Sequence, residues 1–319
     1  MTDDPVTDSV TGDSATDSLA PEAAPALRCS FASEVRGDPL VGTAAPAAGM
    51  VLVEQPGPWG RQALVQSRLD AEVGTALSDR AVAQGLRVLL IRRPGREVAG
   101  REPTVRRWAV VDSRPGREVS YWGTFGDDSE LLELPLDGSV GTSSYDPTYL
   151  ICTHGRHDAC CAIRGRPVAA SLAQARPEAV WECSHVGGDR FAANLVALPH
   201  GLYYGRVDEQ SALDVVAAHE RGEVVAPLLR GRTTFTPVAQ AAQQHARGVL
   251  GEHAINALNP VRAVPAPGHA WDIRLRHQPA DLVATVRSVA SGPEALLTCA
   301  ALHTAHPPAF EVTHLREAG

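Results

Sequence analysis

The chain has 319 residues, of which 44% are hydrophobic and 21% are charged, and its net charge is −8 at pH 7. This length leaves room for two modest domains, and the apolar fraction is sufficient for a buried core. The acidic balance argues against nucleic acid binding, because phosphate backbones are recognised by basic surfaces. No stretch reaches the apolar length of a membrane-spanning helix, so we expect no membrane association.

Residues 1–26 are rich in Asp, Ser, Thr, Pro and Ala and contain almost no side chains that a core would bury. We predict that they form a disordered acidic tail. A secretory signal begins with basic residues and continues with an apolar segment, and this segment has neither. We therefore expect a cytoplasmic protein.

Residues 27–145 have the pattern of a first α/β unit with the element order β-α-β-β-β. Apolar side chains recur at helical spacing over residues 62–84, which predicts a helix there. Apolar runs bounded by turn residues predict strands. The predicted strands cover residues 49–54, 86–91, 108–112 and 119–124.

Residues 146–235 repeat much of this order and form a second predicted unit. Helical patterns cover residues 161–175 and 209–221. The last two predicted strands flank a Pro-His-Gly turn and are expected to form a hairpin. The predicted strands of this unit cover residues 149–152, 180–186, 191–198 and 202–207.

Residues 236–319 follow a different pattern and are predicted to form a small α+β extension. A helix is expected over residues 238–258. We therefore predict an α/β fold class, in which two tandem β-α-β-β units of similar length form thioredoxin-like halves and are followed by this extension. The strands expected in the extension cover residues 271–276, 282–289, 296–302 and 310–315.

Six cysteines are present, and four of them are concentrated in the second unit. A disulfide framework is not expected in a reducing cytosol, whereas clustered cysteines are typical of a metal or redox site. We interpret Cys29 and Cys299, which lie far from the cluster in the sequence, as packing residues. The four clustered residues are Cys152, Cys160, Cys161 and Cys183.

The first chemical motif runs from Cys152 to Cys161 and lies where a predicted strand gives way to a helix. A helix N-terminus favours the thiolate form of a nearby cysteine. Thiolates combined with imidazoles suit iron–sulfur clusters or zinc rather than calcium or magnesium. The motif also contains His154 and His157, which we expect to hydrogen-bond around the site.

The second chemical motif contains Cys183, His185 and Asp189. Cys183 and His185 are two residues apart, so on a strand their side chains point to the same face. Gly187 and Gly188 then allow the backbone to pass close to a bulky group. A Rieske centre needs Cys-x-x-His at this position, and the Cys-x-His found here argues against a Rieske fold.

These motifs carry a resemblance to a known family. The run Cys-Thr-His-Gly-x-x-Asp-x-Cys-Cys, followed by Ser-His-x-Gly-Gly-x-Arg-Phe-Ala-x-Asn and Leu-Pro-x-Gly-Leu-x-Tyr-Gly, resembles the sucrase/ferredoxin-like family. The turn Glu-x-Pro-Gly-Pro-Trp-Gly at residues 54–60 is similar as well. The resemblance covers residues 29–207 and implies a thioredoxin-like ferredoxin domain, which we place over residues 146–235. It also implies a [2Fe–2S] cluster with two cysteines on one iron and two histidines, spaced His-x-x-x-His, on the other.

Carried over residue by residue, the resemblance assigns the two cysteine ligands to Cys152 and Cys161 and the first histidine ligand to His185. The position of the second histidine holds Asp189 instead. Three outcomes are open here. The Asp189 carboxylate coordinates the cluster, the Cys183 thiolate does so, or the cluster is lost.

The vicinal pair of Cys160 and Cys161 leaves two further alternatives open. Either cysteine can supply the ligand, because only the geometry of the loop decides which one faces the site. The pair also leaves slight room for a thiol–disulfide oxidoreductase, although Cys-x-x-Cys is missing from the strand-to-helix loop.

The function that we predict is electron transfer by a ferredoxin-like protein with mixed Cys and His ligation, a redox carrier rather than a catalyst. The alternatives are a structural zinc site, which the same donors suit, and a family member without a cluster. Sucrose hydrolysis is not expected, because it needs paired carboxylates beside a sugar cleft and no such pair stands out. No dinucleotide fingerprint is present, so the electrons are expected from an unidentified redox donor or reductase.

Overall fold

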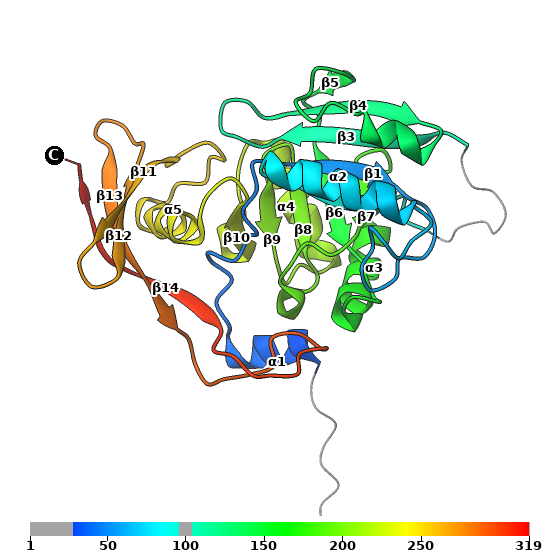
Figure 1. Cartoon of the computed structure of the whole chain (residues 1–319). Helices are drawn as coiled ribbons and strands as arrows, with labels where there is room; N and C mark the ends of the chain where they lie inside the picture. Colours follow the sequence, from blue (N-terminus) through cyan, green and yellow to red (C-terminus); the bar gives the residue numbers. More distant parts are fainter. Residues whose placement is uncertain (1–27, 96–103, 319) are drawn as a thin grey trace, which may run out of the picture.

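The computed structural model describes residues 28–95 and 104–318 (Figure 1). Within these ranges the chain forms a ten-stranded mixed sheet with helices packed on it, and a separate four-stranded antiparallel sheet near the C-terminus. This architecture confirms the predicted α/β fold class. The disordered tail predicted for residues 1–26 lies outside the described residues, and the predicted domain boundaries stay predictions.

Ten strands form the large sheet, and most of them coincide with the apolar runs of the sequence. The central strands are covered on both faces, which explains why they are almost continuously apolar. The strands are β1 (Gly49–Glu54), β2 (Leu86–Arg92), β3 (Arg106–Asp112), β4 (Val119–Phe125), β5 (Thr142–Ser144), β6 (Thr148–Cys152), β7 (Val180–Cys183), β8 (Leu195–Leu198), β9 (Leu202–Tyr204) and β10 (Leu229–Arg232). Their order in the sheet is β10-β9-β8-β6-β7-β2-β1-β3-β4-β5.

The large sheet is built from two units that share one strand order. In the first unit, β1 pairs in parallel with β2 and antiparallel with β3, which continues to β4. In the second unit, β6 pairs in parallel with β7 and antiparallel with β8, which continues to β9. The two units meet edge to edge through a short antiparallel contact between β2 and β7. The functional motifs of the second unit therefore lie beside the first unit.

Five α-helices are described, and the helix of the first unit begins later than predicted. The Asp70 side chain accepts hydrogen bonds from the backbone N–H groups of Glu72 and Val73, at 2.9 and 3.0 Å, and so caps that helix. Leu64 and Leu69 pack on the core from the preceding loop, which gave that loop its helix-like spacing. The helices are α1 (Cys29–Arg36), which was not predicted, α2 (Ala71–Ala83), α3 (Ala159–Ala175), α4 (Glu209–Glu220) and α5 (Pro237–Leu250).

The core that positions the functional motifs lies between the two units. Alternate side chains of β1 point into two different cores, and Leu52 joins the core that contains β6 and β7. Full burial of a leucine side chain stabilises a fold by about 1.5–3 kcal/mol, so this core holds the strand ends firmly. Three of the clustered cysteines are part of it: Cys152, Cys161 and Cys183.

The C-terminal extension consists of α5 and the small antiparallel sheet. α5 packs against β10 and against all four strands of the small sheet, so it connects the extension to the large sheet (Figure 1). The strands of the small sheet are β11 (Pro260–Ala266), β12 (Ala270–Leu275), β13 (Leu282–Ala290) and β14 (Pro308–Glu317). β11 was not predicted, because its two prolines interrupt the strand pattern.

Two other predictions for the extension were wrong. The helix expected up to residue 258 ends at Leu250, because Gly251 adopts a left-handed conformation (φ 66°) that terminates a helix. Residues 296–302 do not form a strand. They belong to residues 291–307, here called the excursion, which contains one isolated bridge between Ala295 and Ala305. Figure 1 shows the excursion leaving the small sheet and lying beside α1.

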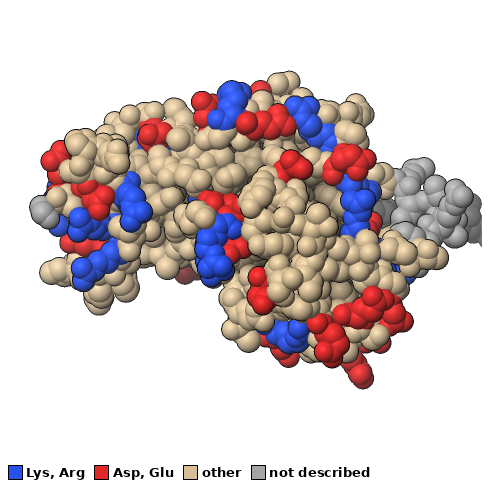
Figure 2. All heavy atoms as spheres, turned by 90° about the horizontal axis from the view of Figure 1, so that it is seen from above, with Lys and Arg blue, Asp and Glu red and all other residues tan. Residues whose placement is uncertain are grey.

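The surface shows no gathered basic face in the view of Figure 2. Arginine and acidic side chains are interspersed there in small groups. Among the described residues, no helix has the length and the apolar character that a membrane span requires. The expected absence of nucleic acid and membrane partners stays a prediction.

Candidate metal centre

The two chemical motifs meet at one edge of the second unit. β6 ends at Cys152 and its parallel neighbour β7 ends at Cys183, and these two residues are paired in register. Because the strands are parallel, the loops that follow them converge at the same edge. Beyond the first loop, Asp158 caps α3 by accepting a hydrogen bond of 2.8 Å from the Cys160 N–H. This cap places Cys160 and Cys161 in the first turn of the helix.

Ligand-type side chains gather where the two loops meet. The Sγ atoms of Cys152 and Cys161 and a ring nitrogen of His185 lie within 4.8 Å of one another. Oδ1 of Asp189 lies 3.2 Å from the Cys161 Sγ and 2.9 Å from the His185 Nδ1. Both cysteines and Asp189 are buried. The residues that the family resemblance assigns as ligands therefore converge on one point, with Asp189 in place of the second histidine.

The Nδ1 atom of His185 is buried and forms no properly directed hydrogen bond with any described residue. The nearby oxygen of Asp189 is close enough, at 2.9 Å, but is not aligned for a hydrogen bond. Because this buried nitrogen forms no directed hydrogen bond, it is available to a bound cation. Two sulfurs, one imidazole nitrogen and one carboxylate oxygen form a donor set that fits iron in a sulfide cluster and also fits zinc.

The pKa shifts in this group reflect protons shared between neighbouring ligand atoms. Burial lowers the pKa of His185, but Asp189 and Cys152 outweigh burial and raise this pKa to about 9. Burial raises the pKa of the Asp189 carboxyl, but the adjacent His185 outweighs it and holds the pKa below its usual value. The Cys161 thiol lowers the pKa of Cys152. Metal binding would displace these shared protons, because thiolate and neutral imidazole are the ligand forms.

Two cysteines that the sequence offered as alternative ligands lie outside this ligand group. Cys183 lies beside Cys152 in the sheet, but its sulfur belongs to none of the ligand groups found among the described residues. The Sγ of Cys160 lies 3.6 Å from that of Cys29 and 3.4 Å from that of Cys299. Cys160 and Cys161 face different groups because consecutive helical side chains differ in direction by about 100°.

His154 and His157 form hydrogen bonds around the site. The Nε2 of His154 donates to the carbonyl of Gly60 at 2.6 Å, and its Nδ1 accepts from the backbone N–H of His185 at 3.3 Å. This pattern requires a neutral ring, and burial lowers the pKa of His154 accordingly. His157 stacks on His185 with 3.7 Å between ring centroids and donates to the carbonyl of Arg61. The first unit therefore helps to position His185.

Two arginines hold the loop that follows β7. Arg87 on β2 donates to the carbonyls of His185 and the next residue, at 2.7 and 2.8 Å. Arg230 on β10 is buried and donates to the carbonyl of Gly187 at 2.8 Å. Gly188 has φ 78°, and a Cβ there would lie 2.4 Å from the Arg230 Nη2. Only glycine fits at this position without strain.

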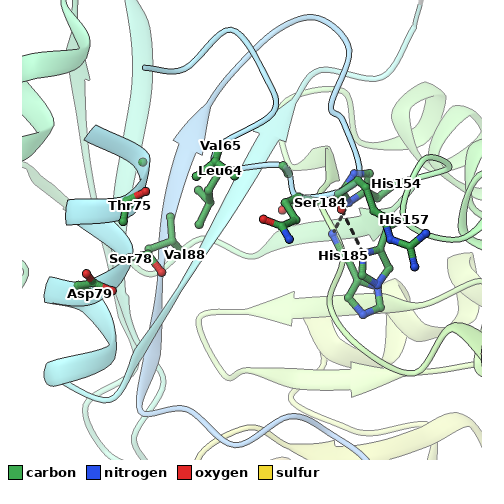
Figure 3. Close-up of a pocket in the computed structure, with 14 residues that line it drawn as sticks. Leu64, Val65, Thr75, Ser78, Asp79, Val88, His154, His157, Ser184 and His185 are labelled. Carbon is green, nitrogen blue, oxygen red and sulfur yellow. Dashed lines mark hydrogen bonds between the residues drawn. The ribbon is translucent and has the colours of Figure 1, made fainter. Parts of the chain in front are cut away.

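A pocket of about 380 Å³ lies beside the site, between the two units (Figure 3). His154, His157 and His185 gather at one end of the pocket, and side chains of α2 such as Ser78 lie at the other end. The side chains of His157 and His185 are 35% and 21% exposed, whereas the two cysteines of the group are buried. The imidazole side is therefore the side that another molecule can approach.

A second cysteine group, which no local sequence pattern predicts, lies at the start of α3. It brings Cys29 and Cys299, which we interpreted as packing residues, within reach of Cys160 and Asp158. Cys29 and Cys299 are 270 positions apart, so no local spacing connects them. Only the folded chain shows that these residues meet.

Comparison with known families agrees with the motifs at the site. The sequence model described as Sucrase/ferredoxin-like matches residues 40–231, which is more than half of the chain. The matched range includes both loops of the candidate metal centre. Searches of curated proteins and of solved structures find no match. The chain therefore belongs to the sucrase/ferredoxin-like family.

Proposed function

We propose that the protein is a ferredoxin-like electron carrier whose [2Fe–2S] cluster is bound by Cys152, Cys161, His185 and Asp189. One observation carries this proposal. Two thiols, a buried carboxylate and an imidazole whose Nδ1 forms no directed hydrogen bond converge where β6 and β7 end. When bound, such a cluster takes up and releases one electron.

The two pairs of ligands differ in their surroundings. Cys152 and Cys161 lie in the core between the units, where the Cys161 thiol already favours the thiolate form of Cys152. His185 and Asp189 come from the loop after β7, next to the pocket. We assign the fourth position to Asp189 rather than Cys183, because Asp189 lies at hydrogen-bond distance from two of the other ligands. A carboxylate adds negative charge relative to a second histidine and so lowers the reduction potential.

The surroundings of the site suit electron exchange with another protein. The apolar core keeps water away from the cysteine side, and the half-buried His157 and His185 face the pocket. Electrons would then be exchanged on the histidine side with a separate redox donor or reductase. All six cysteines are free thiols, which suits the reducing cytoplasm.

Ligand variants test this assignment. Cys161→Ser and Asp189→Ala should abolish or strongly reduce the bound iron and sulfide, since each removes a ligand. Cys183→Ser is the matched control, because this buried cysteine lies beside Cys152 in the sheet and should be dispensable for the cluster. Loss of the cluster in Cys183→Ser together with its retention in Asp189→Ala would contradict the assignment. Circular dichroism checks that each variant is folded.

A structural zinc ion is the second candidate for the same four residues, because their donor set suits zinc as well. The two candidates differ in colour and in sulfide content. A zinc-loaded centre is colourless and contains no inorganic sulfide, whereas an iron–sulfur centre is coloured and contains both iron and sulfide. Stoichiometric zinc that depends on Cys161 would favour the zinc centre.

A further inference from the structure

Three cysteines from distant parts of the chain meet at the start of α3. The Sγ of Cys29 lies 3.6 Å from that of Cys160 and 3.4 Å from that of Cys299. The Sγ atoms of Cys160 and Cys299 are 3.4 Å apart, which closes a triangle of sulfurs. The carboxylate of Asp158 lies next to this triangle, with its Oδ2 3.6 Å from the Cys29 Sγ.

The distances within this group suit one shared metal ion. A tetrahedral zinc site with Zn–S bonds of about 2.3 Å and Zn–O bonds of about 2.0 Å places neighbouring sulfurs about 3.8 Å apart, and sulfur and oxygen about 3.5 Å apart. The observed separations of 3.4–3.6 Å between sulfurs and 3.6 Å between sulfur and oxygen are close to these values. A disulfide would join only two of the three sulfurs, at about 2.05 Å.

The backbone orients the carboxylate toward the sulfurs. The Cys160 N–H donates to Oδ1 of Asp158 at 2.8 Å, and the Cys299 N–H donates to Oδ2 at 2.7 Å. Each oxygen retains a further lone pair, so both hydrogen bonds are compatible with coordination of a cation. The N-terminus of α3 also stabilises negative charge on Asp158 and Cys160.

The excursion that carries Cys299 has few other attachments. Its only bridge within the described residues joins Ala295 to Ala305, and the side chains of Leu296 and Leu302 are exposed. The apolar cluster at the triangle is small and contains Cys29, Cys160 and Ala192. Without extensive burial, a metal ion is the group that would fix this segment on α1 and α3, as structural zinc does in small domains.

We propose that Cys29, Cys160, Cys299 and Asp158 form a structural zinc site, separate from the candidate metal centre. Figure 1 shows α1 and the excursion side by side, and the sulfur distances bring both to the start of α3, which the site ties to them. The two adjacent cysteines then bind different groups: Cys160 is a ligand of the zinc ion, and Cys161 is a ligand at the candidate metal centre. The excursion would thereby fasten the C-terminal extension to the second unit.

Metal analysis of the purified full chain tests this proposal. We expect about one equivalent of zinc per chain, which falls to near zero in Cys29→Ser and Cys299→Ser. Iron and sulfide should be unchanged in both variants, because the four residues of the candidate metal centre remain. Cys183→Ser, a buried cysteine outside the triangle, is the control and should retain its zinc. Zinc that stays bound in both triangle variants, or that disappears in the control as well, would overturn the proposal.

Two further measurements keep the test decisive where a variant folds poorly. Cobalt added in place of zinc to the unmodified protein should give the strong sulfur-to-metal absorption and intense visible bands of a tetrahedral site with three thiolates, whereas the candidate metal centre supplies only two. Chymotrypsin should cleave near Leu296 and Leu302 only after zinc is removed with a chelator, because the excursion is then released. No cobalt bands and equal cleavage with and without the chelator would contradict the proposal. So would a zinc-free protein with a disulfide between two of the three cysteines.

Discussion

Arg87 and His185 are joined across the two units by a hydrogen bond of 2.7 Å, from the Nη2 of the arginine to the carbonyl oxygen of the histidine. The same guanidinium also donates to the carbonyl of Val186 at 2.8 Å. Arg87 belongs to β2 of the first unit, whereas His185 follows β7 of the second. A metal ligand must be held within about 0.5 Å of its working position, so the first unit takes part in building the site.

Replacing Arg87 should loosen this loop. Arg87→Met removes two charge-assisted hydrogen bonds to partly buried carbonyls, and we expect the free energy of unfolding to fall by about 2–3 kcal/mol. The proposed cluster should also be lost faster in air. Urea denaturation and the decay of visible absorbance measure these effects.

Arg80→Met is the matched control for this substitution. Arg80 also donates to two carbonyls, those of Leu131 and Leu134, which lie outside both loops of the candidate metal centre. The Arg80→Met substitution should lower the free energy of unfolding by a similar amount without changing the rate of cluster decay. Equal decay rates in the two variants would show that Arg87 has no particular role at the site.

Gly188 is expected to tolerate no side chain. In Gly188→Ala, the added Cβ would meet the buried guanidinium of Arg230, which its bonds to Gly187 and Asn194 hold in place. We predict that the free energy of unfolding falls by about 2–4 kcal/mol and that much of the bound iron is lost. Gly222→Ala is the control, because Gly222 has a similar φ of 77° and nothing within 4 Å of the added Cβ. If both variants behave alike, backbone strain alone explains the effect.

Asp189→His would recreate the His-x-x-x-His pattern of the family. We expect the cluster to be retained, with a reduction potential that rises by on the order of 100 mV, because a neutral ligand replaces an anionic one. Voltammetry measures the shift. Asp79→His changes the net charge equally at an exposed position in the same pocket, so its potential should move far less. An unchanged potential in Asp189→His would argue that Asp189 does not coordinate the cluster.

In the metal-free protein, the stability contributed by protonated His185 should be lost as the pH rises. Asp189 and Cys152 raise the pKa of His185 from 6.5 to about 9 in the folded state. The stabilisation by protonated His185 is therefore complete below pH 6.5 and is lost as the pH rises through about 9. We expect the His185 contribution to the free energy of unfolding to decrease by about 1–3 kcal/mol across this range. Denaturation in the presence of a reductant measures this decrease as a function of pH. The decrease should be smaller in Asp189→Asn than in the unmodified protein. An equal decrease in both proteins would contradict the role of Asp189.

The sequence predicted the elements that bury apolar side chains in regular patterns. The strands β1 and β2 are covered on both faces, so their apolar runs marked them clearly. Apolar patterns gave wrong predictions where the apolar residues lie outside helices and strands. Leu64 and Leu69 pack on the core from a loop, whereas the exposed Leu296 and Leu302 lie in an excursion without strand partners.

The candidate metal centre could be predicted because its residues are close in sequence or belong to recognisable motifs. Cys152 and Cys161 share one loop and helix start, and His185 and Asp189 share the next loop. The direction of each cysteine depends on the helix phase, which the sequence alone leaves open. The meeting of Cys29 with Cys299 depends on where α1 and the excursion pack, and no local pattern encodes that contact.

The most direct test of the central proposal is anaerobic purification followed by iron and sulfide analysis, visible absorption, and EPR after reduction with dithionite. Our account predicts a coloured protein with about two irons and two sulfides per chain and an EPR signal that appears on reduction. A colourless protein without sulfide, even after an attempt to reconstitute the cluster, would contradict it.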